Sequence, residues 1–232
     1  MTTKTLNISE EQLVDYSKAH NEPSWMTELR KKALKLTETL EMPKPDKTKL
    51  RKWDFDTFKQ HHTTGDSYHQ LTDLPKSVKE IIDVENSENL IIQHNNDLAY
   101  TQVSDQAKND GVIIEGLSEA LVNHSDLVQK YFMTKAVNVD EHRLTALHTA
   151  LVNGGIFVYV PKNTVVEHPI QYVVLHDDEQ ASFYNHAIIV TEESAEVTYV
   201  ENYLSTTSGE DNQLNIVSEV IAGANSNVTY SS

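Results

Sequence analysis

The chain of 232 residues contains no cysteine. This absence excludes disulfides, thiol nucleophiles and thiolate ligands for metal ions or iron–sulfur clusters within this chain. Basic residues are also scarce, because 19 Lys and Arg stand against 35 Asp and Glu, and the formal net charge is −16. Nucleic acids and anionic lipid surfaces are bound by clustered cations, so we expect neither as a partner.

Long apolar runs are missing as well. No run approaches the ~20 apolar residues that span a bilayer, and the opening MTTKTLNISEEQ lacks the apolar core of a signal peptide. We therefore expect a cytoplasmic protein. The sequence also has no P-loop, GxGxxG, GxSxG or HExxH motif. Nucleotide binding and the common hydrolase reactions thus have no motif in this chain, and we assign no catalytic residue.

The most informative feature that is present is a repeat in residues 154–232. Three similar blocks follow one another with a period of about 30 residues, and each joins two β-branched runs through a short turn. The blocks are FVYVPKNTVVEHPI, AIIVTEESAEVTY and EVIAGANSNVTYSS, and the matched pairs include Ile189 with Val220 and Tyr199 with Tyr230. A strand repeat of this length is typical of a solenoid, in which stacked units bury a shared core.

The repeat predicts the fold class. We expect a mainly β protein with an α+β N-terminal region, whose core is a right-handed parallel β-helix, that is, a single-stranded solenoid. The chain stops at Ser232 inside the third block, so we expect a piece of a longer protein, truncated at the C-terminal end of the β-helix. Uncovered strand edges pair readily with other chains. We therefore also expect this fragment to self-associate through its Ser232 end.

The N-terminal region shows helical patterns. Ser9 and Gln12 form a capping box before the first helix, and Pro23 opens a second, longer helix. Apolar residues recur at steps of three and four along this second helix, namely Trp25, Leu29, Ala33, Leu36 and Leu40. This stripe favours packing within the N-terminal region, with a partner-docking helix as the alternative. Arg30 lies mostly off the stripe.

Composition changes divide the chain into three regions. We expect an N-terminal helical region in residues 1–55, a mixed α/β region in 56–153 and the start of the β-helix core domain in 154–232. The middle region begins with a polar, irregular connector. It continues with NLIIQHNNDLAYTQV, which predicts a hairpin that turns at Asn95 and Asn96, because asparagine tolerates the positive φ of a tight turn.

Eleven histidines raise the question of a metal site. His61, His62 and His69 share one polar loop, but such a loop lacks the hydrogen bonds that fix metal ligands in place. His142 and His148 share a predicted helix at a spacing that places them on different faces, so they cannot hold one ion together. Solvated or capping roles are favoured for both. We therefore assign no metal ligand and no cofactor-binding residue.

An enzymatic alternative is a carbohydrate-active β-helix, a class in which acidic residues stack on adjacent coils. Asp177 and Asp178 form an acidic pair in a turn, but Ser208 and Gly209 occupy the positions one period later, so the acids do not stack. Glu167 with the adjoining His168 could form an acid–base pair. Successive residues of a strand point to opposite faces, which favours a structural role instead.

Several segments together resemble a known family. They are EPSWMTELRKKALKLTETLEMPKPDKTKLRKWDFDTF, GVIIEGLSEAL, LTALHTALVNGGIFVYVPKNTVVEHPIQ and HAIIVTEESAEVTYVENY. In order and spacing they resemble the SufB/SufD family of iron–sulfur cluster assembly scaffolds. The matching residues of the first segment are Glu22, Pro23, Trp25, Arg30, Lys32, Ala33, Leu34, Pro43, Trp53 and Phe55. The ending around Trp53 and the Pro-rich linker favour the SufD branch, with the SufB branch as the alternative.

The resemblance implies a non-enzymatic scaffold subunit of the SUF complex. Such a subunit pairs with a SufB-like scaffold and recruits a SufC-like ATPase, the latter through a C-terminal part missing from this chain. The complete complex assembles the iron–sulfur cluster, and no cofactor is expected on this chain itself. The family's functional histidine in later coils is also missing here, so the resemblance transfers no catalytic residue.

Overall fold

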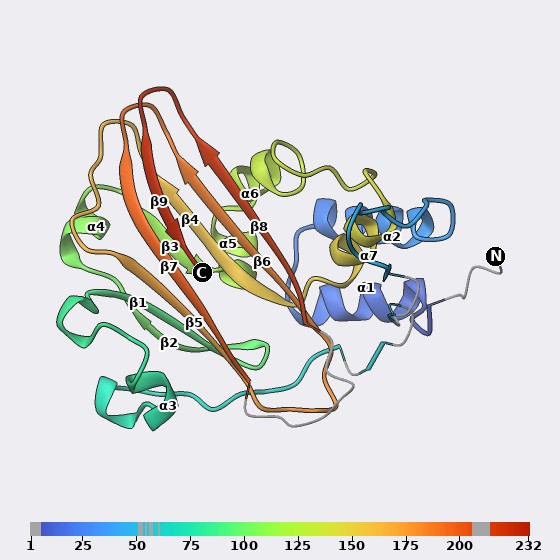
Figure 1. Cartoon of the computed structure of the whole chain (residues 1–232), viewed down its shortest axis with the longest axis horizontal. Coiled ribbons are helices and arrows are strands. Elements are labelled where there is room, and N and C mark those ends of the chain that lie inside the picture. Colours follow the sequence, from blue (N-terminus) through green and yellow to red (C-terminus); the bar gives the residue numbers. More distant parts are fainter. Residues whose placement is uncertain (1–5, 51–52, 54, 56–57, 60, 206–213) are drawn as a thin grey trace.

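The strands of the protein form two sheets, as a computed structural model of the chain shows (Figure 1). The structure describes residues 6–50, 53, 55, 58–59, 61–205 and 214–232. One sheet has the strand order β2-β1-β5-β7-β9 and the other β3-β4-β6-β8. The strands are β1 Asn89–His94, β2 Asp97–Gln102, β3 Ile113–Gly116, β4 Gly154–Val160, β5 Ile170–His176, β6 Phe183–Thr191, β7 Glu196–Ser205, β8 Leu214–Ala222 and β9 Asn227–Ser231.

The repeat in the sequence corresponds to parallel strand pairing. From β4 to β9 the chain alternates between the two sheets, and β4, β6 and β8 pair in parallel, as do β5, β7 and β9. The residues matched in the repeat are direct neighbours, Ile189 with Val220 across β6 and β8, and Tyr199 with Tyr230 across β7 and β9. Similar side chains therefore stack side by side, which is how parallel ladders keep their register.

The prediction of a right-handed parallel β-helix is nevertheless wrong. The fold is mixed α/β, with two mixed sheets and, in the described part of the chain, seven α-helices. Each sheet ends in an antiparallel strand, β2 in one and β3 in the other. Both strands come from the non-repeating middle of the chain. A repeat specifies the parallel neighbours of a strand, but it does not specify how non-repeating segments complete and cover the sheets.

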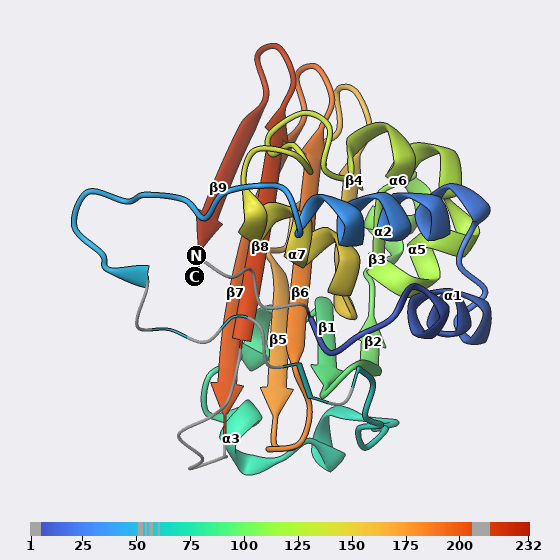
Figure 2. The ribbon, with the colours of Figure 1, turned by 90° about the vertical axis from the view of Figure 1, so that its right-hand side faces the viewer.

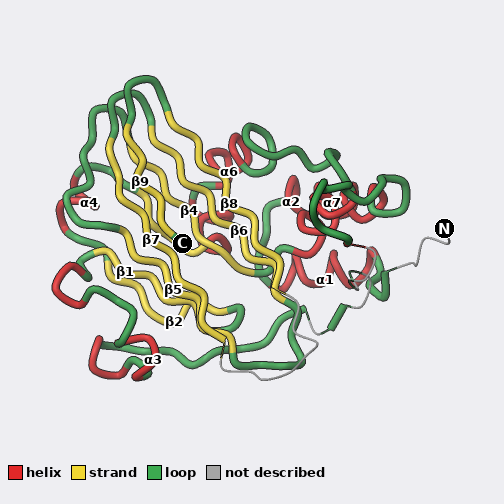
Figure 3. The backbone as a smooth tube through the Cα atoms, viewed as in Figure 1, coloured by secondary structure: helices red, strands yellow, loops and turns green. Residues whose placement is uncertain are grey.

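Helices lie mainly on one side of the four-stranded sheet (Figures 2 and 3). The helices are α1 Glu10–Ala19, α2 Ser24–Leu36, α3 Lys76–Lys79, α4 Asp105–Asn109, α5 Leu117–Asn123, α6 Ser125–Tyr131 and α7 Arg143–Leu151, with single 3₁₀ turns η2 Leu71–Asp73 and η3 Val84–Asn86. The capping box of α1 is confirmed, since the Gln12 amide donates to Ser9 Oγ at 3.2 Å and the Ser9 amide to Gln12 Oε1 at 2.8 Å. None of the described helices is long and apolar enough to cross a membrane.

Apolar contacts form the core between the sheets and on their outer faces, and a further cluster joins α1, α2 and α7. Between the sheets, Ile156 and Ile189 of one pack with Tyr172 and Val197 of the other. On the outer face of the four-stranded sheet, helical residues such as Leu121 cover β4 and β6. On the outer face of the five-stranded sheet, the segment around α3 covers β1 and β5. Each large apolar side chain buried in this way stabilises the fold by roughly 1.5–3 kcal/mol.

The face that α2 buries differs from the predicted stripe. Its buried residues are Met26, Arg30 and Ala33, while Trp25 and Leu29 are partly buried. The Trp25 indole donates to Ser125 Oγ at 2.9 Å, so this side chain packs within the protein, as the intramolecular interpretation of the stripe requires. The prediction that Arg30 lies off the packed face is wrong.

Arg30 is buried because it satisfies the end of another helix. Its guanidinium donates to the carbonyl oxygens of Ala150 and Val152 at 3.0 and 2.7 Å, at the end of α7, where the last carbonyls of a helix lack partners. It also forms a two-point ion pair with Glu22, at 2.8 and 2.6 Å. Burial alone would raise the pKa of Glu22, but Arg30 and a hydrogen bond from Ser17 outweigh it and hold the pKa below its ordinary value.

Candidate functional site

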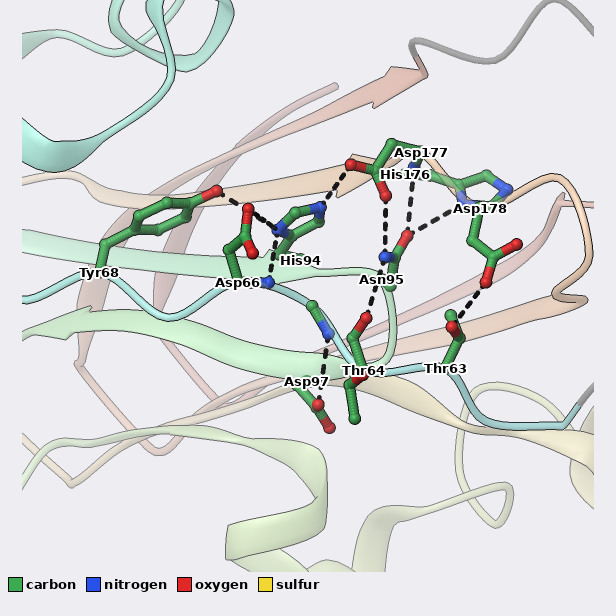
Figure 4. A network of polar contacts seen from close by, with 11 residues as sticks. Thr63, Thr64, Asp66, Tyr68, His94, Asn95, Asp97, His176, Asp177 and Asp178 are labelled. Atoms are coloured by element: carbon green, nitrogen blue, oxygen red, sulfur yellow. Dashed lines mark hydrogen bonds and ion pairs between the residues drawn. The ribbon is translucent and has the colours of Figure 1, made fainter.

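A polar network joins the ends of β1 and β5 to the connector that precedes them (Figure 4). Because β1 and β5 are parallel, His94 at the end of β1 lies beside the end of β5. His94 Nε2 is 2.9 Å from Asp177 Oδ2, and the Asn95 side-chain amide donates to Asp177 Oδ1 at 2.9 Å. Burial alone would raise the pKa of Asp177, but these hydrogen bonds hold it below its ordinary value.

Both ring nitrogens of His94 take part in hydrogen bonds. The Asp66 amide donates to Nδ1 at 2.8 Å, so Nδ1 carries no proton and Nε2–H donates to Asp177. The Tyr68 hydroxyl lies 3.3 Å from the same Nδ1. Burial, together with the nearby Asp66 and Asp177 carboxylates, raises the pKa of the Tyr68 phenol, which keeps it protonated. In this network both ring nitrogens of His94 and the Tyr68 hydroxyl thus take part in hydrogen-bond contacts.

What the network does is fasten the connector to the sheet. Gly65 passes so close to β1 that a Cβ atom at this position would lie 2.0 Å from the carbonyl oxygen of His94. The Thr63 hydroxyl donates to Asp178 Oδ2 at 2.6 Å, and this hydrogen bond lowers the pKa of Asp178. The close backbone approach requires a glycine, and the hydrogen bonds on both sides of it fix the register of the connector.

The acidic pair of the carbohydrate-enzyme alternative is used inside this network. Asp177 accepts from His94 and Asn95, and Asp178 accepts from Thr63 and from the Gln180 amide. The positions Ser208 and Gly209, with which the pair was compared, lie outside the described residues. Neighbouring His176 is buried, and its Nε2 has no hydrogen-bond partner among the described residues. The arrangement is that of a structural turn, which weakens the enzymatic alternative.

The loop histidines are held by separate partners. His61 Nε2 lies 3.1 Å from the Leu151 carbonyl oxygen, and His62 Nε2 lies 2.8 Å from Asp97 Oδ1, while His69 is exposed. Burial and the nearby Arg30 lower the pKa of His61 to about 3. Within the described ranges, no group of three or more His, Asp or Glu side chains is placed to hold a metal ion.

Other residues considered from the sequence have structural contacts. His142 caps α7, since its Nδ1 accepts from the Thr145 amide at 3.1 Å, which confirms the predicted capping role. Glu167 is exposed, and the adjoining His168 lies 3.5 Å from Glu88, so the two do not act together.

For His148 the predicted solvated or capping role is wrong, because the side chain is fully buried beside His186 of β6. A third buried titratable residue, Glu219 of β8, completes this cluster. The cluster could not be predicted from the sequence, because no local pattern brings α7, β6 and β8 together. The only available signal was that β6 and β8 carry matched repeat blocks, which places His186 and Glu219 near adjacent positions.

The fold defines a class of mixed α/β protein with two sheets of mainly parallel strands. The polar networks of the site hold loops and helices of the same chain against these sheets. Comparison with known families identifies the family to which the chain belongs. The family description "SufBD protein N-terminal region" matches residues 10–172, and "SUF system FeS cluster assembly, SufBD core domain" matches residues 173–232. The chain belongs to the SufBD family, as its sequence predicted.

Individual relatives agree with this assignment. The chain is 47% identical over 226 residues to the iron–sulfur cluster assembly protein SufD of Bacillus subtilis, covering 97% of this chain and 52% of the relative. It is 29% identical to a SufBD family protein of Pyrococcus horikoshii, covering 84% of this chain and 45% of the relative. It is 26% identical to a SufBD family protein of Staphylococcus epidermidis, covering 96% and 50%. The chain thus spans about half the length of the curated relatives it matches.

Proposed function

We propose that this chain acts as part of a SufD-like, non-enzymatic scaffold subunit in the assembly of iron–sulfur clusters by the SUF system. The observation that carries the proposal is the 47% identity to a SufD protein over 97% of this chain. The polar network at His94 and Asp177 supports a scaffold role, because the His94 ring joins the connector at Asp66 to the end of β5 at Asp177. The iron–sulfur cluster is the cargo of the complete complex, and this chain itself binds no cofactor.

The proposed partners are a SufB-like scaffold and a SufC-like ATPase. The surface that we consider for protein contact lies along β8 and β9, the last strands in the described sheet orders. We call it the open end, and it exposes four large apolar side chains, Leu214, Ile216, Val220 and Tyr230. Exposed apolar side chains beside strand edges are typical of surfaces that further strands or another protein chain cover. The same surface supports self-association of this chain.

The test is a pull-down from the native cytoplasm, with this chain and the full-length gene product as parallel baits. We expect the full-length bait to recover a SufB-like scaffold and a SufC-like ATPase, and this chain to recover less of the ATPase. A matched pair of variants locates the contact, with Ile216→Asp at the open end and Val122→Asp at an exposed position on α5. Recovery of neither partner by either bait would contradict the scaffold function.

A further inference from the structure

Three titratable side chains form a continuous hydrogen-bonded chain inside the protein. His148 of α7, His186 of β6 and Glu219 of β8 are each fully buried. His148 Nε2 lies 2.9 Å from His186 Nδ1, and His186 Nε2 lies 3.0 Å from Glu219 Oε1. At the other end, His148 Nδ1 lies 2.8 Å from the side-chain oxygen of Asn215, which is also on β8. This series of hydrogen bonds therefore starts at Asn215 of β8, passes through α7 and β6, and returns to β8 at Glu219.

Glu219 also holds the loop that follows α6. Its Oε1 accepts from the Met133 amide at 2.7 Å and its Oε2 from the Val137 amide at 3.1 Å. Met133 has a φ of 52°, in the left-handed region that non-glycine residues rarely adopt, so this loop needs such anchors. The side chain of one glutamate thereby fixes loop 132–137 to β8, the last strand in the described order of its sheet.

The hydrogen bonds determine which nitrogen of each imidazole carries the proton. Because both oxygens of Glu219 accept backbone N–H groups, the residue is best satisfied as a carboxylate, and His186 donates to it from Nε2. His186 Nδ1 then accepts from His148 Nε2–H, and both rings are neutral. An additional proton would go to His148 Nδ1, where the oxygen of Asn215 can accept its hydrogen bond. In the neutral state the Asn215 amide must turn so that its NH₂ group donates instead.

Among the described residues, few other charges face this cluster. Arg30 of α2 acts on His148, and the Tyr184 ring of β6 lies beside it at 6.2 Å between centroids. Burial lowers the pKa of His148 well below its ordinary value, and His186 and Arg30 lower it further. Burial also lowers the pKa of His186, although Glu219 opposes this effect. The closed structure thus disfavours the protonation of both rings.

We propose that His148, His186 and Glu219 form an acid-sensitive clasp, which holds loop 132–137 and strand β8 against the helices at neutral pH and releases them on acidification. Solvent reaches the two imidazoles only when the clasp opens, since both side chains are fully buried. Opened rings bind protons at their ordinary pKa, whereas closed rings bind them only at a lower pH. The closed state is therefore fully favoured above the ordinary value of 6.5 and loses this advantage as the pH falls.

The clasp lies under the surface proposed for partner binding. β8 directs Glu219 toward the helices, and its alternate residues Ile216 and Val220 are exposed at the open end. Release of β8 would therefore disturb that surface, and acid would weaken partner contact there. The clasp itself is argued from contacts inside this chain and does not depend on the proposed function.

The test is hydrogen exchange of the Met133 and Val137 amides as a function of pH, corrected for intrinsic exchange rates. The opening constant should rise about tenfold per pH unit for each proton taken up, between about pH 6.5 and the lowered pKa values. The amide of Val112, which donates to Ala107 far from the cluster, should show no such rise. Corrected protection of Met133 and Val137 that stays constant from about pH 7.5 to about pH 5 would overturn the proposal.

Two variants and one spectrum test the role of the two imidazoles directly. His148→Gln removes one of the two imidazoles. The opening constant of the two amides should therefore rise less steeply with falling pH, by about one proton. His69→Gln, at an exposed histidine, should leave the response unchanged. If His148→Gln does not fold, imidazole nitrogen-15 spectra of the unaltered protein decide the matter. They should show both rings with a single N–H at neutral pH, and a doubly protonated ring would overturn the proposal.

Discussion

The outer strands at the two ends of the sheets differ in how far other segments cover them. At one end, β2 is covered by the connector, whose Tyr68 amide donates to the Ala99 carbonyl oxygen at 2.8 Å, and β3 runs directly into α5. At the open end, β8 and β9 leave Ile216, Val220 and other apolar side chains exposed. The covered end thus contributes to stability, whereas the open end is the surface for which we propose contact with another protein chain.

The largest effect is expected inside the covered region, at Arg30. Arg30→Ala leaves the Glu22 carboxylate and two carbonyl oxygens of α7 buried without their donor. Loss of one partner of a buried ion pair costs about 3–5 kcal/mol. Urea denaturation should show this loss in the free energy of unfolding. Lys32→Ala, at an exposed position on the same helix, is the control, and equal stability of the two variants would contradict the account of Arg30.

A smaller loss is expected at the connector. Gly65→Ala places a Cβ atom against the His94 carbonyl oxygen, and relieving such overlap costs about 1–3 kcal/mol. Gly116→Ala is the matched control, because a Cβ atom there would lie 3.7 Å from Leu98, an ordinary contact. Thermal unfolding should separate the two variants. If both melt at the same temperature as the unaltered chain, the connector is not fastened as described.

Acid should weaken the covered region through Glu22, whose pKa is held below its ordinary value. A carboxyl group with a lowered pKa contributes stability above the unfolded value of 4.5, and this contribution disappears as the pH falls through the lowered value. The slope for one proton is at most about 1.4 kcal/mol per pH unit. Unfolding measured from about pH 6 to about pH 3 should show a shallower slope for Glu22→Gln than for the unaltered chain. Identical slopes would exclude Glu22 as a source of acid sensitivity.

The smallest effect on stability is expected at the open end. Val220→Ser alters an exposed side chain and should change the free energy of unfolding by no more than about 0.5 kcal/mol. It should nevertheless reduce the proposed self-association, which light scattering at high protein concentration can follow. A strictly monomeric mass for the unaltered chain would count against self-association through this end.

The sequence predicted local structure and family better than it predicted the fold. The capping box at Ser9, the hairpin turn at Asn95 and the pairing of Tyr199 with Tyr230 depend on neighbouring residues or on the repeat, and all three are confirmed. The order of the resembling segments also identified the family correctly. The β-helix prediction failed, because periodicity in the last third of the chain says nothing about how the middle third completes the two sheets.

The polar clusters were the least predictable part. His94 and Asp177 lie close together because β1 and β5 pair in parallel, although these strands are far apart in the sequence. His148 was expected to be solvated or to act as a cap, yet it meets His186 and Glu219 in the interior. A polar residue in an amphipathic helix is usually exposed, and only knowledge of its tertiary partners changes that expectation.

The proposed contact joins the open end, formed by β8 and β9, to a SufB-like scaffold. It is tested most directly by sedimentation velocity on purified components, with the SufB-like protein of the same organism mixed with this chain or with its Ile216→Asp variant. The account predicts a complex that forms with the unaltered chain and is lost in the variant, while both chains remain folded. A complex that forms equally well with both, or with neither, would contradict it.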